Sequence, residues 1–71
     1  MRLTDLAVGD LARVTGYVAY AAQLMYLGLI PGTEFRLNRE APLGDPVEIR
    51  YRGFSLCLRP TEADCLEVER V

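Results

Sequence analysis

The chain has 71 residues, of which 51% are hydrophobic and 25% are charged, a composition typical of one small globular domain rather than of a disordered segment. Its formal net charge is −2, from ten acidic residues and eight arginines, and it contains neither lysine nor histidine. The acidic balance argues against a dedicated nucleic-acid binder, and the missing imidazole and amine remove the commonest general base and metal ligand. We therefore expect a binding protein that is not an enzyme and has no cofactor.

The sequence also indicates where the protein works. No apolar run approaches the ~20 residues that a membrane-spanning helix needs. The first ten residues, MRLTDLAVGD, include acidic residues where a secretory signal would be apolar. We expect a single domain over residues 1–71, cytoplasmic and without direct membrane insertion, whose two cysteines, Cys57 and Cys65, stay reduced.

The first half of the chain predicts one strand and one helix. Leu11 to Thr15 alternates apolar and polar side chains and predicts a short strand that ends at Gly16. Tyr20 to Leu27 lacks glycine and proline and predicts about two helical turns. Either of the following glycines, Gly28 or Gly32, could end this helix.

The second half of the chain predicts strands. Thr33 to Glu40 alternates again, and Pro42 to Pro46 has the proline and glycine content of a loop. Pro60 to Asp64 predicts a turn or a single helical turn, and Leu66 to Glu69 predicts a last strand. The fold class is thus mainly β, with about five strands and one short helix after the first strand, and a small, strongly curved barrel would protect the sheet edges.

The clearest structural signal is a β-hairpin between residues 47 and 58. If Arg52-Gly53 is a two-residue turn, six apolar side chains fall on one face of the hairpin. The expected facing pairs are Val47–Leu58, Ile49–Leu56 and Tyr51–Phe54. Arginine is not the preferred first residue of such a turn, so a bulged connection is the alternative.

The predicted helix has more apolar surface than so small a chain can bury. At 100° per residue, one stripe contains Leu24 and Leu27, the expected core anchors, and a second stripe lies on the far side of the helix. Because contiguous exposed apolar surface usually marks a contact site, we expect the second stripe to bind a protein partner. Its members are Ala22, Met25, Tyr26 and Leu29. Two alternatives stay open: the chain's own loops cover this stripe, or two copies pack there as a homodimer.

Two other kinds of site are less favoured by the residues. Glu62, Asp64 and Cys65 lie close together, but without imidazole they are expected to form a solvated acidic turn rather than a metal site. Arginines follow the β half of the chain, but glutamates interleave with them, as on an ordinary solvated surface, so nucleic-acid binding is the weaker alternative. These arginines are Arg36, Arg39, Arg50, Arg52 and Arg59.

Several segments resemble the ferrous iron transport protein A family, FeoA. The resemblance is carried by the pair LGLIPG (residues 27–32) and APLGDP (residues 41–46), by Leu56 to Arg59 and by Glu62-Ala63. It implies an SH3-like barrel, cytoplasmic in bacteria, that binds the cytosolic part of the ferrous iron transporter FeoB and modulates it. Related domains occur at the C-terminus of some iron-dependent transcriptional regulators, which keeps a self-associating or nucleic-acid-binding domain as the alternative.

The chain departs from its relatives in the predicted helix. Family members often carry basic residues just before the LGL motif, where this chain has Ala21, Ala22 and Gln23. Docking through this helix is therefore expected to be more apolar and less sensitive to salt than a charge-driven contact.

Overall fold

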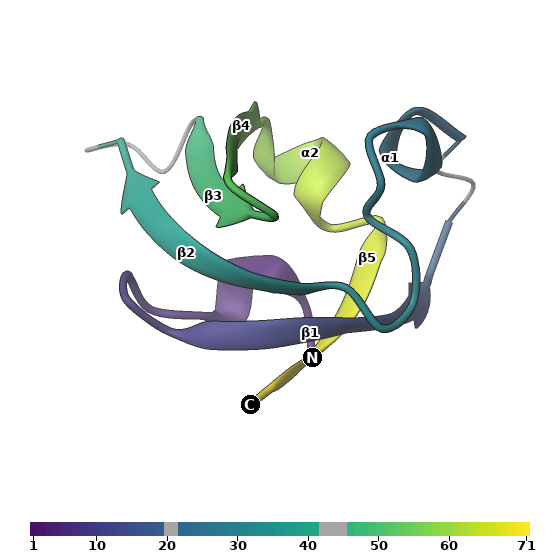
Figure 1. Ribbon diagram of the computed structural model, residues 1–71, viewed down its shortest axis with the longest axis horizontal. Helices are drawn as coiled ribbons and strands as arrows, with labels where there is room; N and C mark the ends of the chain where they lie inside the picture. Colours follow the sequence, from purple (N-terminus) through teal and green to yellow (C-terminus); the bar gives the residue numbers. More distant parts are fainter. Residues whose placement is uncertain (20–21, 42–45) are drawn as a thin grey trace.

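A computed structural model describes residues 1–19, 22–41 and 46–71, and its strands form one antiparallel sheet (Figure 1). The spatial order of the strands is β4-β3-β2-β1-β5, so β1 pairs with both β2 and β5. The strands are β1 (Leu11–Tyr17), β2 (Glu34–Glu40), β3 (Val47–Tyr51), β4 (Phe54–Leu58) and β5 (Leu66–Arg70). The prediction of a mainly β chain with five strands is confirmed.

The described ranges also contain three short helices, one before the first strand and two between strands. A 3-10 helix, η1 (Leu3–Asp5), precedes β1, α1 (Ala22–Tyr26) follows it, and α2 (Pro60–Ala63) links β4 to β5. The helix after the first strand and the helical turn at Pro60 are therefore confirmed. Residues 20–21 of the predicted helix, and residues 42–45 of the predicted loop, lie outside the described part of the chain.

The β3–β4 hairpin has the predicted register. Tyr51 lies opposite Phe54, Ile49 opposite Leu56 and Val47 opposite Leu58. Arg52 (φ 51°) and Gly53 (φ 82°) both have positive φ, which is the backbone of a type I′ turn, so the bulged alternative is wrong. Along β4 burial decreases toward the turn, where Phe54 is 66% exposed, whereas Tyr51 on β3 stays buried.

Strand β1 is longer than predicted. Instead of ending at Gly16 it runs on to Tyr17, with a register shift against β5 between Val14 and Gly16. Such a bulge bends the strand and increases its twist, which a small curved sheet needs. A second register shift between β2 and β3 falls at Leu37 to Arg39.

The core fills the concave side of this sheet. Inward-facing residues of all five strands are joined there by Leu3 from η1 and Leu24 from α1. Helix α1 lies at the end of the molecule opposite the C-terminal end of β2 (Figure 1). None of the helices in the described ranges is long and apolar enough to cross a bilayer.

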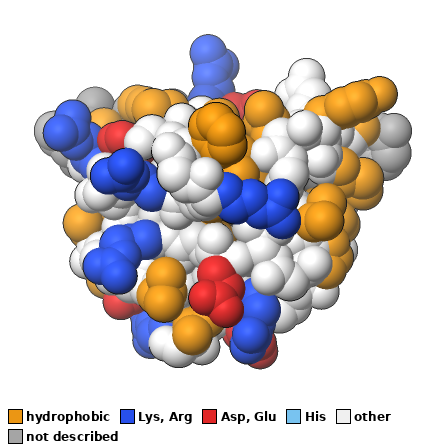
Figure 2. Space-filling view, in the orientation of Figure 1, with side chains coloured by type: hydrophobic (Ala, Val, Ile, Leu, Met, Phe, Trp, Pro, Cys, Tyr) orange, Lys and Arg blue, Asp and Glu red, His pale blue; other side chains and the backbone are white. Residues whose placement is uncertain are grey.

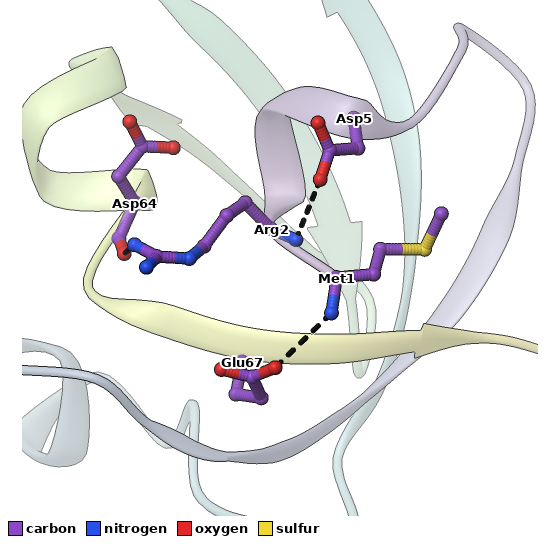
Figure 3. A network of polar contacts seen from close by, with 5 residues as sticks. All are labelled: Met1, Arg2, Asp5, Asp64 and Glu67. Atoms are coloured by element: carbon purple, nitrogen blue, oxygen red, sulfur yellow. Dashed lines mark hydrogen bonds and ion pairs between the residues drawn. The ribbon is translucent and has the colours of Figure 1, made fainter.

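The first two residues cover the outer edge of β5 (Figure 3). Arg2 forms a β-bridge with Glu67, and the Val68 N–H donates to the Met1 carbonyl at 2.8 Å. The Arg2 guanidinium also donates to the Asp64 carbonyl at 2.9 Å, at the end of α2. One of the two sheet edges is therefore paired by the chain itself.

Candidate protein-binding site

Helix α1 and the turn after it expose a set of apolar side chains. Tyr26 is 93% exposed, and Met25, Leu27 and Ile30 are each 44% exposed. We call these four residues the α1 patch. Figure 2 shows hydrophobic side chains gathered at the upper right, where Figure 1 places α1. The alternative in which the chain's own loops cover Met25 and Tyr26 is therefore wrong.

Two residues of the predicted apolar stripes face the opposite way from their prediction. Leu29, expected on the outward stripe, is completely buried, and Leu27, expected as a core anchor, is exposed. Leu24 is buried as predicted, and Ala22 is half-buried at the start of the helix. The outward surface thus keeps Met25 and Tyr26, loses Leu29 and gains Leu27.

The end of α1 explains this exchange. Gly28 has a φ of 88°, a left-handed conformation that reverses the chain after the last helical turn. The Leu29 N–H donates to the Leu24 carbonyl and the Gly28 N–H to the Met25 carbonyl, both at 3.0 Å, the pattern of a Schellman motif. This motif commonly packs its sixth residue against its first, here Leu29 against Leu24. Because the helix has ended before Leu29, the 100° spacing of a helix no longer predicts which way the Leu29 side chain points.

Three hydroxyl groups hold the turn after α1 in place. The Tyr51 hydroxyl donates to the Leu27 carbonyl at 2.5 Å, Thr33 donates to the Gly28 carbonyl at 2.9 Å, and Tyr17 donates to the Leu29 carbonyl at 2.6 Å. Burial raises the pKa of Tyr17, so its hydroxyl stays protonated and able to donate. Three consecutive carbonyls at a helix end are thus satisfied by side chains from β1, from β3 and from Thr33, the residue before β2. This hydroxyl network fixes the α1 patch to the sheet.

An arginine-lined groove of about 410 Å³ crosses β1, β2 and β3 on the outer side of the sheet. Its charged side chains are Arg36 and Glu34 from β2, Arg50 from β3 and Arg52 from the hairpin turn. From the sequence alone, an ordinary mixed-charge surface is expected here. The pairing of charges across the strands, which composition cannot show, differs from that expectation.

Charges on the outer side of the sheet are balanced in one row and unbalanced in the next. Arg13 lies 2.6 Å from Glu69 and 3.9 Å from Glu34. Arg36 lies directly opposite Arg50, and neither makes an ion pair or a side-chain hydrogen bond with any described residue. Like charges in facing positions destabilise a strand pair. The Arg36–Arg50 pair therefore lowers the stability of the sheet, and no described contact compensates for it.

The groove adjoins the α1 patch. A Cβ placed on Gly28 would lie 3.6 Å from Arg52 Nη1 and 3.9 Å from Tyr51 Cε2. Tyr51 also donates its hydroxyl to the carbonyl of Leu27, a member of the patch. The cationic groove and the apolar patch are therefore neighbouring parts of one surface.

The acidic turn near the C-terminus is engaged in local structure. Glu62 accepts a hydrogen bond from the Arg59 N–H at 3.1 Å, Asp64 accepts one from the Thr4 hydroxyl at 2.7 Å, and the Cys65 thiol lies 3.6 Å from the Thr61 carbonyl. Within the described residues, no group of three or more histidine, cysteine or acidic side chains has the arrangement to hold a metal ion.

Comparisons with known proteins point to one family. The profile of the family described as the FeoA domain matches residues 1–70. A protein of Porphyromonas gingivalis, a fusion of Fe(2+) transport protein A with the Fe(2+) transporter FeoB, is 34% identical over 74 residues. That match takes in the whole of this chain but only 9% of the fusion protein.

Solved structures agree with this match. The FeoA protein of Chlorobium tepidum is 39% identical, with a TM-score of 0.90 over all of this chain and 70% of that one. The zinc-complexed FeoA of Stenotrophomonas maltophilia, described as a prokaryotic SH3 domain protein, is 26% identical, with a TM-score of 0.84 over 97% of this chain and 89% of that one. The predicted SH3-like fold is confirmed.

Proposed function

This chain belongs to the FeoA family, and on that premise we propose that it is a cytoplasmic accessory protein of ferrous iron uptake. It binds the cytosolic part of a FeoB-type transporter and modulates transport. The FeoA–FeoB fusion in Porphyromonas gingivalis supports this partner, because it holds the two proteins together in one chain. The structural observation that carries the proposal is the exposed α1 patch, since contiguous exposed apolar surface marks contact sites.

The proposed action is binding without chemistry of its own. The chain has no histidine or lysine to act as a general base. An accessory protein of this kind changes transport by binding one conformation of the transporter more tightly than another. The hydroxyl network fixes the turn that carries Leu27, so little ordering is needed when the patch binds.

Substitutions in the α1 patch test the proposal. Tyr26→Asp and Met25→Asp place a charge at an apolar contact, and each is expected to weaken capture of the purified transporter cytosolic part by about tenfold or more. Both side chains are exposed in the free protein, so the circular dichroism spectrum should not change. Capture is measured by titration on the immobilised cytosolic part.

Val8→Asp is the matched control, because Val8 is also an exposed apolar residue, 56% accessible, but lies in the turn before β1. Equal loss of capture in the control, or unchanged capture in both patch variants, would contradict docking through α1. The other possible occupant of the α1 patch is a second copy of the chain. Sedimentation at micromolar concentration would then show a dimer, and Tyr26→Asp would dissociate it.

A further inference from the structure

We infer that Arg36, Arg50 and Arg52 form a carboxylate-binding groove that receives an acidic segment of the protein partner beside the α1 patch. The inference rests on the proposed function for the identity of that partner. The docking surface then has two parts: the apolar α1 patch and a cationic groove that binds by electrostatic attraction.

The facing arginines are the first observation behind this inference. Arg36 and Arg50 are direct partners across β2 and β3, where their mutual repulsion costs stability. An arginine in the next row of the sheet, Arg13, has glutamates on both sides, so this chain does place compensating acids on the same surface. A carboxylate supplied from outside would relieve the repulsion between Arg36 and Arg50, and planar guanidinium groups suit carboxylate oxygens.

The backbone of Arg52 is the second observation. Its φ of 51° is in the left-handed region, which asparagine and glycine tolerate far better than arginine does. The turn holds the Arg52 side chain at the rim of the groove and its guanidinium beside Gly28. Arginine is a poor residue for this backbone conformation. Its presence at position 52 is therefore better explained by what its side chain does at the groove than by the needs of the turn.

The surroundings of the groove favour an acidic protein segment over a nucleic acid. Glu34 lines the same groove, and Glu48 lies beside Asn38 on its border, so a continuous polyphosphate would meet like charges. The aromatic residues along the groove, Phe35 and Tyr51, have buried side chains and offer it no ring face on which a base could stack. A short pair of carboxylates next to an apolar anchor fits both the groove and the α1 patch.

The test uses the ¹⁵N-labelled full chain titrated at low salt with a capped diglutamate peptide, which carries the short pair of carboxylates that the groove is expected to bind. The amide signals of Arg36, Arg50 and Arg52 are expected to shift together. The double variant Arg36→Gln/Arg50→Gln should bind the peptide about tenfold more weakly, as expected for loss of charge-assisted hydrogen bonds. Arg59→Gln is the control, because Arg59 is an exposed arginine at the other end of β4 and does not line the groove.

Any of four results would overturn the inference. Shifts scattered over the whole surface, or an equal loss in Arg59→Gln, would mean that the groove has no special role. Tighter binding of an oligothymidylate or of inorganic phosphate than of the diglutamate peptide at the same signals would assign the groove to phosphate instead. Capture of the transporter cytosolic part that Arg36→Gln/Arg50→Gln leaves unchanged would remove the groove from the docking surface.

Failure of the wild-type chain to capture the transporter would contradict the proposed function alone, because the diglutamate peptide reports on the groove without the transporter.

Discussion

Asp10 joins the start of β1 to the end of β5 through one carboxylate oxygen. This oxygen accepts a hydrogen bond from the Ala7 N–H at 2.8 Å and lies 3.0 Å from Arg70 Nη2. The Ala7 hydrogen bond, and after it the positive charge of Arg70, hold the pKa of Asp10 below its ordinary value of 3.8. Because the folded state favours the charged carboxylate, Asp10 stabilises the fold above that value, and the stabilisation is lost as pH falls through the lowered pKa.

Asp10→Asn should therefore flatten the acid limb of the stability curve. The variant is expected to be less stable than the wild type near pH 6, and the difference should shrink as pH falls through the lowered pKa of Asp10, where the wild-type carboxylate becomes protonated too. Urea unfolding midpoints at a series of pH values measure this. A difference between the two proteins that stays constant across the range would contradict the role given to the Asp10 charge.

At the scale of single elements, the hairpin and the helix show why one could be predicted from the sequence and the other only in part. Two alternating strands with a two-residue turn have one register that puts all their apolar side chains on one face, so the pairing of Ile49 with Leu56 follows from the residues alone. A helical wheel assumes that the helix continues. The sequence predicts Gly28 as a possible end of the helix, but it does not indicate that this glycine turns Leu29 inward.

The hydroxyl network could not have been predicted. Tyr17, Thr33 and Tyr51 lie on three different segments, and nothing in their spacing indicates that their hydroxyls converge on three consecutive carbonyls. Only the curvature of the sheet, with its bulge after Val14, brings them together. The position of the α1 patch is therefore a property of the tertiary structure.

The hairpin turn allows stability and binding to be separated. Arg52→Asn replaces an unfavourable left-handed arginine with the residue preferred before glycine in a type I′ turn, and should stabilise the protein by about 0.5–1 kcal/mol. The same substitution removes one cation from the groove and should weaken binding of the diglutamate peptide. Thermal unfolding and peptide titration on the same sample measure the two effects. Loss of stability in Arg52→Asn would mean that the arginine side chain supports the fold rather than a ligand.

Over the whole molecule, composition gave an incomplete account of the surface. The net charge of −2 describes the charge of the surface on average, and from it one expects a mixed-charge surface without special features. The facing arginines become visible only when the pairing of β2 with β3 is known, because Arg36 and Arg50 are far apart in the sequence. Net charge constrains solubility and long-range attraction, whereas local binding depends on which charges face each other.

The two halves of the proposed docking surface should respond differently to salt. Contacts of the α1 patch are apolar and insensitive to ionic strength, whereas carboxylates held by Arg36 and Arg50 at the surface are screened. Wild-type affinity for the transporter cytosolic part is therefore expected to fall roughly tenfold between about 50 and about 500 mM NaCl. In Arg36→Gln/Arg50→Gln, affinity should begin lower, change little and approach the wild-type value at high salt.

Tyr26→Asp gives the complementary result, because it damages the apolar half and leaves the arginines in place. Its affinity should be lower than that of the wild type at every salt concentration, and the dependence on salt should have a similar slope. Titrations at four or five salt concentrations are enough to measure these slopes. A wild-type affinity that does not change with salt would exclude the groove from the interface, and a steep slope retained in Arg36→Gln/Arg50→Gln would place the charged contact on another part of the surface.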